Sequence, residues 1–217
     1  MNNKKIIISI EGNIGVGKTS LMDLLKKQFN DVEFIYEPVD EWLNIKDENG
    51  KDLLHTFYDD KKRYGYLFQN IAYITRMEKI VNSILNSEKK YIFLDRSLDA
   101  DLNTFAKILY DTKYTNEIEW NAYNKWNDFF NRYFGNCVDH KIIYLRCSPD
   151  TAYKRIHIRN RESEKNIDLE YLNLVHQYHD DWLLNIKNNI TIIDADKNFI
   201  SDDPIELCNK IKVFMQN

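Results

Sequence analysis

The 217-residue chain is poor in the residues that interrupt or cross-link a fold, with 6 Gly, 3 Pro and 3 Cys. The low glycine and proline content excludes collagen-like and low-complexity proteins. No internal repeat or shift in composition marks a boundary, so we predict one domain over residues 1–217. Cys137, Cys147 and Cys208 are odd in number, widely spaced and without a CxxC pair. This pattern favours reduced thiols and a cytoplasmic protein over a disulfide framework or a zinc site.

Long hydrophobic runs and clusters of one charge are also absent. The first apolar run, residues 6–10, is too short for a signal-peptide core or a membrane span, and Glu11 ends it. We therefore expect no membrane partner. The formal net charge is −4, and lysine and arginine form no cluster. The charge pattern of a protein that binds polymeric nucleic acid is missing, so we expect no such partner.

What the sequence does contain is an alternation of short apolar runs with helix-like stretches. Residues 6–10 form a β-branched run that stops at a glycine-rich turn, as in a strand buried on both faces of a parallel sheet. Apolar spacing predicts helices over residues 19–29 and 63–88, the second with a broad apolar face that suits a core or a partner subunit. This alternation predicts an α/β layered fold. The other predicted strands are residues 32–36, 91–94, 141–145 and 190–193.

A phosphate-binding motif lies between the first predicted strand and the first predicted helix. Residues 12–19, GNIGVGKT, match G-x-x-x-x-G-K-[ST] in the strand–turn–helix context that the motif requires. In such a loop Lys18 reaches the β and γ phosphate oxygens, and Thr19 offers a hydroxyl to Mg²⁺. The alternative is a glycine turn that only joins strand to helix. The motif predicts a nucleoside triphosphate, expected to be ATP, with Mg²⁺, held by a backbone that includes Gly12, Asn13, Gly15 and Gly17. By itself it does not identify the acceptor.

Polar segments follow the next two predicted strands: EPVDEW at residues 37–42 and DRSLDAD at residues 95–101. Ligands bind at this edge of an open α/β sheet. With GNIGVGKTS, YLFQ at residues 66–69 and RIHIRNRESE at residues 155–164, these segments resemble the deoxyribonucleoside kinase family, above all its deoxycytidine and deoxyguanosine kinase branch. The matches run in family order over nearly the whole chain.

The resemblance implies a fold, an assembly and a reaction. The fold would be the P-loop kinase fold, with a parallel five-stranded sheet flanked by helices and an arginine-rich lid at about residues 155–165. The assembly would be a homodimer. The reaction would transfer the γ-phosphate of ATP or another nucleoside triphosphate to the 5′-hydroxyl of a deoxyribonucleoside.

The same resemblance assigns roles at the phosphates. Glu37 matches the general base that accepts the proton of the 5′-hydroxyl, and Arg96 matches an arginine near the 5′-oxygen and the transferred phosphate. Asp95 stands where the family more often has glutamate, so this metal ligand is expected to reach Mg²⁺ through water. The residues expected in the lid or around the adenine of ATP are Arg155, Arg159, Arg161, Asn198 and Phe199.

A nucleoside site is implied as well. Tyr58 and Glu164 match the pair that binds the 3′-hydroxyl, and Tyr171 supports Glu164. Phe68 matches an aromatic side chain that stacks on the base, and Gln69 matches an amide that reads the edge of the base. The apolar walls are expected from Val39, Trp42, Leu54 and Phe105.

Three further residues match those that select the base in deoxycytidine-type members: Ala72, Arg76 and Asp101. An aspartate held by an arginine accepts a hydrogen bond from the amine of cytosine, whereas thymine offers a carbonyl and a methyl group there. The resemblance therefore favours deoxycytidine or purine deoxynucleosides over thymidine. Each assignment has a structural alternative. Arg76 and Asp101 could form an ion pair that only stabilises the fold. Glu37 could be a solvated loop residue, and Trp42 and Phe68 could be ordinary core residues.

Two other functions remain open at this point. A nucleoside monophosphate kinase similar to thymidylate kinase shares the loop, sheet and lid, but it needs basic groups where Glu37 and Asp101 are found. A catalytically inactive scaffold subunit is the second alternative, because a fold does not fix a function. Lys18, Glu37 and Arg96 are all present, which counts against lost catalysis.

Overall fold

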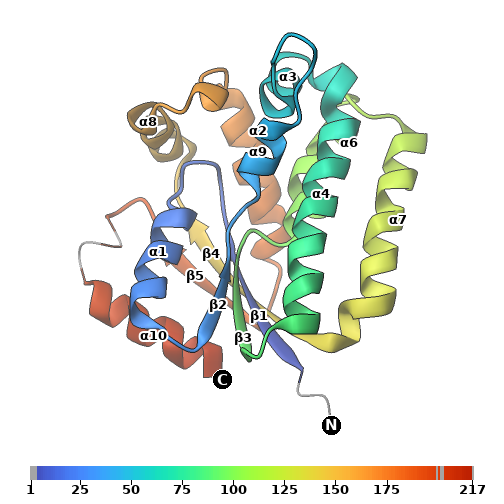
Figure 1. The fold of residues 1–217 in the computed structure, drawn as a ribbon. Coiled ribbons are helices and arrows are strands. Elements are labelled where there is room, and N and C mark those ends of the chain that lie inside the picture. Colours follow the sequence, from blue (N-terminus) through green and yellow to red (C-terminus); the bar gives the residue numbers. More distant parts are fainter. Residues whose placement is uncertain (1–3, 199, 201–202, 217) are drawn as a thin grey trace.

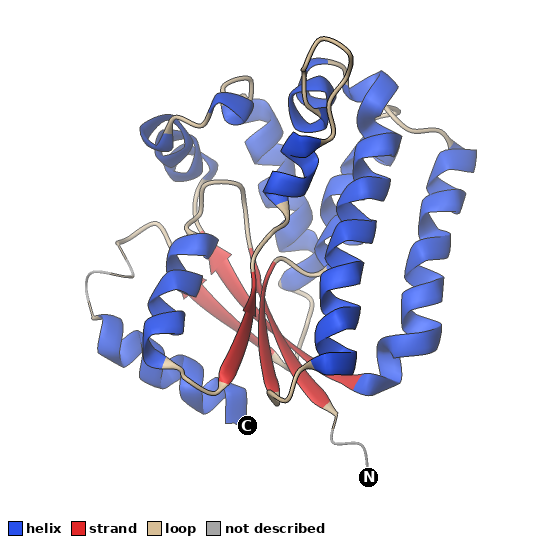
Figure 2. Ribbon diagram, in the orientation of Figure 1, coloured by secondary structure: helices blue, strands red, loops and turns tan. Residues whose placement is uncertain are grey.

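The computed structural model describes residues 4–198, 200 and 203–216. A parallel five-stranded sheet with the order β2-β3-β1-β4-β5 runs through the described chain (Figures 1 and 2). The predicted α/β fold is confirmed, and all five predicted strands are present. Their bounds are β1 Lys5–Glu11, β2 Val32–Ile35, β3 Tyr91–Asp95, β4 Val138–Arg146 and β5 Ile190–Asp194.

β1 is the central strand, since it pairs with both β3 and β4. Ile8 and Ile10 are fully buried, as expected for a β-branched run in a parallel sheet with both faces covered. The register aligns Ile10 with Asp95 on β3 and Glu11 with Tyr144 on β4. The phosphate motif and the DRS segment therefore leave the same edge of the sheet on adjacent strands.

Helices cover both faces of this sheet (Figure 1). α1 (Lys18–Gln28) and α10 (Pro204–Gln216) lie on one face, and α4 (Lys61–Asn86) lies with α7 (Glu117–Phe134) on the other. α4 begins two residues before its predicted start, because the side chain of Asp60 accepts a hydrogen bond from the backbone N–H of Arg63 and caps the helix. Each helical layer packs an apolar core against the strands.

Short helices gather beyond the carboxyl ends of the strands, at the top of the view in Figure 2. One of them is a single π-helical turn, in which the backbone N–H of Ala106 donates to the carbonyl oxygen of Asp101. The elements at this end are α2 Val39–Asn44, α3 Leu53–Asp59, α5 Leu98–Ala100, the π-turn Asp101–Phe105, α6 Ala106–Asp111, α8 Pro149–Arg159, the 3-10 turn Glu162–Glu164 and the start of α9 Leu169–Leu183. A further 3-10 turn, Gly135–Cys137, lies at the opposite end, between α7 and β4.

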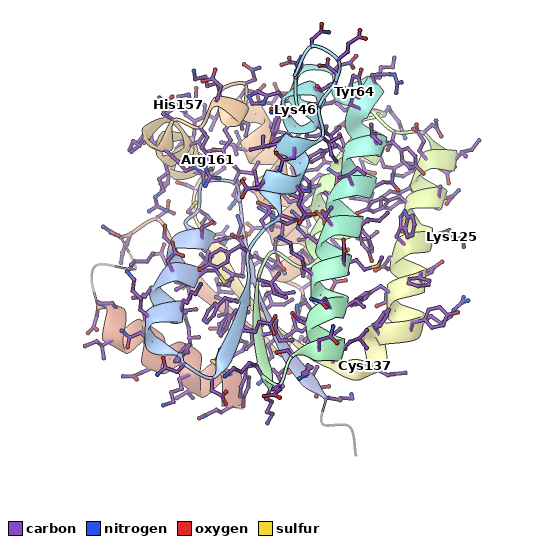
Figure 3. The ribbon with its side chains drawn as sticks, viewed as in Figure 1. Lys46, Tyr64, Lys125, Cys137, His157 and Arg161 are labelled. Carbon is purple, nitrogen blue, oxygen red and sulfur yellow. The ribbon has the colours of Figure 1, made fainter. Side chains whose placement is uncertain are left out.

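All three cysteines are free thiols. Burial raises the pKa of Cys147 to about 11 and also raises the pKa of Cys208. Cys137 is exposed and lies below α7, far from the upper edge of the sheet (Figure 3). Among the described helices, none combines the length and the apolar character needed to cross a membrane.

Candidate active site

A cavity of about 580 Å³ opens at the carboxyl edge of the sheet. Its walls come from the loop after β1, the ends of β2 and β3, the upper part of α4, the π-turn, α8 and the segment after β5. The predicted site residues that line it are Gly15, Gly17, Lys18, Thr19, Glu37, Val39, Trp42, Leu54, Tyr58, Phe68, Gln69, Ala72, Arg76, Asp95, Arg96, Asp101, Phe105, Arg155, Arg159, Arg161, Glu164, Tyr171 and Asn198. Phe199 lies outside the described residues.

The glycines of the phosphate motif are required by space as well as by backbone conformation. Gly12 has φ +141°, and a Cβ atom there would lie 2.4 Å from the carbonyl oxygen of Leu145. Gly15 has φ +79°, and its Cβ atom would lie 2.7 Å from Cγ1 of Ile156. Real side chains do not fit at such distances, and left-handed backbone favours glycine. The loop can therefore approach β4 and α8 closely only with this sequence.

Gly12 and Asn13, both predicted to hold ATP, are not among the residues that line the cavity. The side chain of Asn13 turns inward, where its Nδ2 donates to the carbonyl oxygen of Leu172 at 2.9 Å. Its Oδ1 accepts from the backbone N–H of Ile14 at 2.8 Å. Asn13 thus ties the loop to α9, and its side chain does not reach into the cavity.

Lys18 lies folded back on its own loop. Its Nζ donates to the carbonyl oxygens of Asn13 at 3.0 Å and of Gly12 at 3.4 Å. Burial, followed by repulsion from Arg96, lowers the pKa of Lys18 to about 8. A phosphate group beside this amine would favour the charged form again.

Two oxygen donors suited to Mg²⁺ meet at the same end of the cavity. Thr19 Oγ1 donates to Asp95 Oδ2 at 2.9 Å. The other carboxylate oxygen, Asp95 Oδ1, is buried and has no hydrogen-bond partner among the described residues. Burial raises the pKa of Asp95. A hydroxyl and a carboxylate fit a Mg²⁺ ion that takes its remaining ligands from phosphate and water.

A buried arginine joins two acids in the middle of the cavity. Arg76 donates through Nη2 to Glu37 Oε1 and through Nη1 to Asp101 Oδ2, and Arg96 Nε lies 3.6 Å from the same Glu37 oxygen. Burial alone would raise the pKa of Glu37, but the charges of Arg76, Arg96 and Lys18 outweigh it and hold this pKa at about 2. Burial prevails at Asp101, and its pKa is raised despite the contact with Arg76.

Arg96 adopts an unusual backbone conformation, with φ +76°. A residue other than glycine in this region costs about 1–3 kcal/mol and persists only where its surroundings hold it. Its backbone N–H donates to the carbonyl oxygen of Ile10 at 3.2 Å, and its Nη1 donates to that of Gly12 at 3.2 Å. The guanidinium also lies over the ring of Phe105, 4.4 Å from its centroid. These contacts direct Arg96 toward the phosphate loop.

Aromatic rings form the opposite end of the cavity. Phe68 stacks on Phe57 with centroids 4.4 Å apart, and Trp42 meets Phe68 edge-on at 5.3 Å. Trp42 is buried, donates through Nε1 to Thr75 Oγ1 at 3.0 Å, and also lines the cavity. It is therefore both a core residue and a wall. Phe57 was missed by the sequence analysis, although it lies three residues after Leu54 on one helical face.

Two side chains at this end carry buried polar atoms without partners. Gln69 and Arg76 line the cavity, and neither Gln69 Oε1 nor Arg76 Nε has a hydrogen-bond partner in the described part of the chain. Buried polar atoms are nearly always paired in proteins. Together with the small side chain of Ala72, these two residues of α4 make this wall polar.

The lid arginines divide into two groups. Arg159 Nη2 donates to Glu164 Oε2 at 2.5 Å, and Arg161 Nη1 lies 3.7 Å from Glu164 Oε1. α8 ends at Arg159, and Asn160 with φ +50° turns the chain so that Arg161 faces the same acid. Arg161 lies beside α8 at the upper edge of the molecule (Figure 3).

Arg155 takes no part in that contact. Its Nη1 donates to the carbonyl oxygens of Ala195 at 2.7 Å and Val16 at 3.2 Å, and its Nη2 donates to that of Lys197 at 3.3 Å. Arg155 thus joins α8 to the phosphate loop and to the segment after β5. Asp196 of this segment accepts from the backbone N–H of Ser148 at 3.0 Å and also lines the cavity, which sequence reasoning did not foresee.

The predicted sugar-binding residues lie together at the cavity wall. Tyr58, Tyr171 and Glu164 all line it. Burial, with smaller contributions from Tyr171 and Glu164, raises the pKa of Tyr58 well above its ordinary value, and burial raises that of Tyr171. Both phenols therefore keep their protons and remain hydrogen-bond donors at neutral pH.

Comparison with known proteins identifies the family. The profile of the deoxynucleoside kinase family matches residues 8–216. The chain belongs to this family. It is 34% identical to the deoxycytidine kinases of Rattus norvegicus and Homo sapiens, over 96% of this chain and 90% of each relative. It is 31% identical to the mitochondrial deoxyguanosine kinase of Xenopus laevis, over 96% of this chain and 89% of that relative.

The kinase is therefore a phosphotransferase that acts on the hydroxyl group of a deoxynucleoside. The predicted family, fold and reaction class are confirmed. Neither a monophosphate acceptor nor an inactive scaffold is supported by these matches.

Proposed function

We propose that the kinase transfers the γ-phosphate of ATP, or of another nucleoside triphosphate, to the 5′-hydroxyl of deoxycytidine or a purine deoxynucleoside in preference to thymidine. The observation that carries this proposal is the buried Arg76–Asp101 pair beside Gln69. The relatives described above, deoxycytidine kinases and a deoxyguanosine kinase, are named for substrates of this same class.

The base would lie between Phe68 and the polar atoms of α4. The exocyclic amine of cytosine is a donor, and it would meet Asp101 Oδ2 or the unpartnered Gln69 Oε1. Thymine presents a carbonyl oxygen at that position. This oxygen is a hydrogen-bond acceptor, and it would face the acceptor oxygens of Asp101 and Gln69 with no hydrogen between them. A purine would offer N7 or O6 to the donors of Arg76.

Glu37 would act as the general base. Because its pKa is held at about 2, its carboxylate is ionised at neutral pH and ready to accept the proton of the 5′-hydroxyl. Phosphoryl transfer depends mainly on alignment and on stabilising the charge of the transferred group. Glu37 would therefore chiefly orient the hydroxyl, while Arg96 and Lys18 would neutralise the phosphate oxygens.

The lid would exchange partners when a triphosphate enters. Arg159 and Arg161 hold Glu164 in this structure, and phosphate oxygens would compete for both guanidinium groups. Glu164 would then be released to bind the 3′-hydroxyl with Tyr58. This exchange would couple the sugar site to the donor site.

Further residues would hold the donor and the metal. Arg155, Asp196 and Asn198 lie where the adenine of ATP would enter, at the end of the cavity next to the phosphate loop. Thr19 and Asp95 would hold Mg²⁺, either directly or through water. The ion would supply charge neutralisation at the β and γ phosphates.

The assembly would be a homodimer in the cytoplasm. α4 and α7 lie side by side (Figure 1). Both helices carry exposed apolar side chains that a second copy would cover. The free state of all three cysteines suits a reducing compartment. The exposed apolar residues on these two helices are Leu67, Leu85, Ile118, Phe129 and Tyr133.

A substrate panel with a matched pair of double variants tests the base preference. Wild-type enzyme with ATP and Mg²⁺ should phosphorylate deoxycytidine or a purine deoxynucleoside with higher kcat/KM than thymidine or any nucleoside monophosphate. In the Arg76→Met, Asp101→Ala variant the ratio of thymidine to deoxycytidine kcat/KM should rise by about 10- to 100-fold. Changing both residues together avoids leaving a single buried charge.

The control uses an exposed ion pair on neighbouring elements. Lys79 on α4 lies 3.3 Å from Glu41 on α2, and both are solvent-exposed. The Lys79→Met, Glu41→Ala variant should keep the wild-type ratio. A wild-type preference for thymidine, or an unchanged ratio in the Arg76 and Asp101 variant, would refute the proposed base recognition.

A further inference from the structure

The strained conformation of Arg96 needs an explanation beyond the side-chain contacts of this residue. Arg96 has φ +76°, and its own backbone N–H is held by the carbonyl oxygen of Ile10. The next backbone N–H, that of Ser97, donates to a side chain: Glu11 Oε1 accepts it at 2.9 Å. Ile10 and Glu11, two successive residues of β1, thus accept the hydrogen bonds from the backbone N–H groups of Arg96 and Ser97.

We propose that Glu11 is a positioning residue for phosphoryl transfer, which fixes Arg96 by accepting the hydrogen bond from the backbone N–H of Ser97. The proposal rests on the catalytic role of Arg96 given above. Glu11 does not line the cavity, so it acts through Arg96 and has no contact with substrate. Its contribution is to keep the arginine in a conformation that it would otherwise leave.

The environment of Glu11 argues for a specific role. The side chain is fully buried, and its second oxygen, Oε2, has no hydrogen-bond partner within the described residues. An apolar side chain of the same length would avoid the unfavourable burial of that oxygen. Among the described residues, the hydrogen bond that this carboxylate accepts comes from Ser97, so this bond is what distinguishes glutamate from an apolar residue here.

The bond also controls the chain that follows. Ser97 caps α5, since its Oγ accepts from the backbone N–H of Ala100 at 3.3 Å. α5 leads directly into the π-turn that begins at Asp101. Fixing Ser97 therefore sets both the direction of Arg96 and the start of the segment that presents Asp101.

The chain provides a matched control in Glu33 on β2. Its Oε2 is likewise buried without a partner among the described residues, while its Oε1 accepts from Ser83 Oγ. Neither Glu33 nor Ser83 lines the cavity. Replacing Glu33 thus removes a comparable strand carboxylate that has no connection to Arg96.

The test compares three substitutions of Glu11, with kcat, KM for both substrates and thermal unfolding measured for each. Glu11→Gln keeps the acceptor at the same reach without the charge, and kcat should stay within about threefold of wild type. Glu11→Asp keeps the charge but retracts the acceptor by about 1.5 Å, and Glu11→Met removes it. In both, kcat should fall by about 10- to 100-fold with little change in nucleoside KM, as expected for a misplaced catalytic group. Glu33→Met should leave kcat unchanged.

The order of the variants decides the outcome. Activity that follows charge, with Glu11→Asp above Glu11→Gln, would overturn the proposal, as would a wild-type kcat in Glu11→Met. If Glu11→Met does not fold, the comparison of Gln with Asp still decides. A separate Arg96→Met variant with normal kcat would remove the proposed role of Arg96 itself, whereas an inactive Arg96→Met with an active Glu11→Asp would remove only the role of Glu11.

Discussion

The two ends of the cavity are built in different ways. At the phosphate end, the backbone makes the site: Gly12 and Gly15 adopt positive φ angles, and their lack of a side chain allows contact with β4 and α8. At the nucleoside end, side chains make the site: Phe68 and Arg76 come from α4, and Asp101 comes from the π-turn. A backbone site recognises the phosphates shared by every nucleoside triphosphate. A side-chain site can change its choice of base by substitution without changing the fold.

Glu37 lies where the two ends meet, so its replacement gives the largest expected effect. Glu37→Gln should keep nucleoside affinity but lower kcat by about two to four orders of magnitude, the range for loss of a positioned acid–base group. Lys18→Ala should lower kcat similarly and also weaken ATP binding, because it removes a charge at the phosphate end. Steady-state kinetics measure the loss of turnover in both variants, and calorimetry shows whether nucleoside binding is kept. A Glu37→Gln enzyme with nearly normal turnover would show that this carboxylate is not the base.

A smaller effect is expected when the substrate, and not the enzyme, is changed at the nucleoside end. A 2′,3′-dideoxynucleoside would leave Tyr58 and Glu164 without their proposed partner, and each unpaired buried group costs about 1–3 kcal/mol. We expect kcat/KM to fall by about 100-fold or more relative to the parent deoxynucleoside. Equal rates for parent and dideoxy substrates would contradict the sugar-site assignment.

The pH profile tests the electrostatic link between the ends. With its pKa held at about 2, Glu37 stays ionised above pH 5, so kcat/KM should show no acid limb from this group between pH 5 and 7. The Arg76→Met substitution removes the charge that lowers the pKa of Glu37 most strongly. The effect of burial is then less well compensated, so the pKa of Glu37 should rise. The acid limb should then move upward by about one to three pH units, from about pH 2 to between about pH 3 and pH 5, so kcat/KM has to be measured from about pH 3 upward. An unchanged profile would mean that Arg76 does not set the ionisation of Glu37.

The smallest effect concerns stability. His179 is fully buried behind Phe105, and burial, followed by repulsion from Arg96, lowers its pKa to about 3. The unfolded chain therefore binds a proton that the folded chain does not between pH 6.5 and about 3, so stability from this group falls as the pH falls through that window. In His179→Leu, the slope of unfolding free energy should be smaller by about 1.4 kcal/mol per pH unit. Urea titrations at several pH values measure the unfolding free energy of both proteins. The same dependence on pH in wild type and in His179→Leu would show that His179 does not contribute to it.

The sequence predicted the sheet well because its strands are continuous apolar runs, a local property that survives packing. β4 begins at Val138, three residues before its predicted start, because the segment from Val138 to His140 is mixed in polarity and its strand conformation depends on pairing with β1. Most of the residues that line the cavity were also expected in a site, since the majority of them stand inside the motifs at residues 12–20, 37–42, 66–69, 95–101 and 155–164.

What the sequence did not predict are contacts between distant segments. The Arg76–Glu37 pair depends on how α4 docks against the end of β2, and neither residue's neighbours encode it. Arg155 was assigned to the phosphates, yet its guanidinium donates to the carbonyl oxygens of Val16 in the phosphate loop and of Ala195 after β5, and no local pattern around Arg155 indicates these contacts. Glu11 appeared only as the end of an apolar run, because its partner Ser97 is far along the chain.

The π-turn from Asp101 to Phe105 limits how the length of this enzyme can vary. A π-turn holds one residue more than the α-helical turn it replaces. Deleting one residue inside the turn would let the N–H of Ala106 close an α-helical bond to the same carbonyl oxygen of Asp101, so the helix after the turn would keep its place. The side chains within the turn would be redistributed around the axis, and Asp101 and Phe105 would lose their present directions toward Arg76 and Arg96. Insertions and deletions among natural relatives should therefore accumulate in exposed loops such as residues 46–51, while the spacing between Asp101 and Phe105 stays constant.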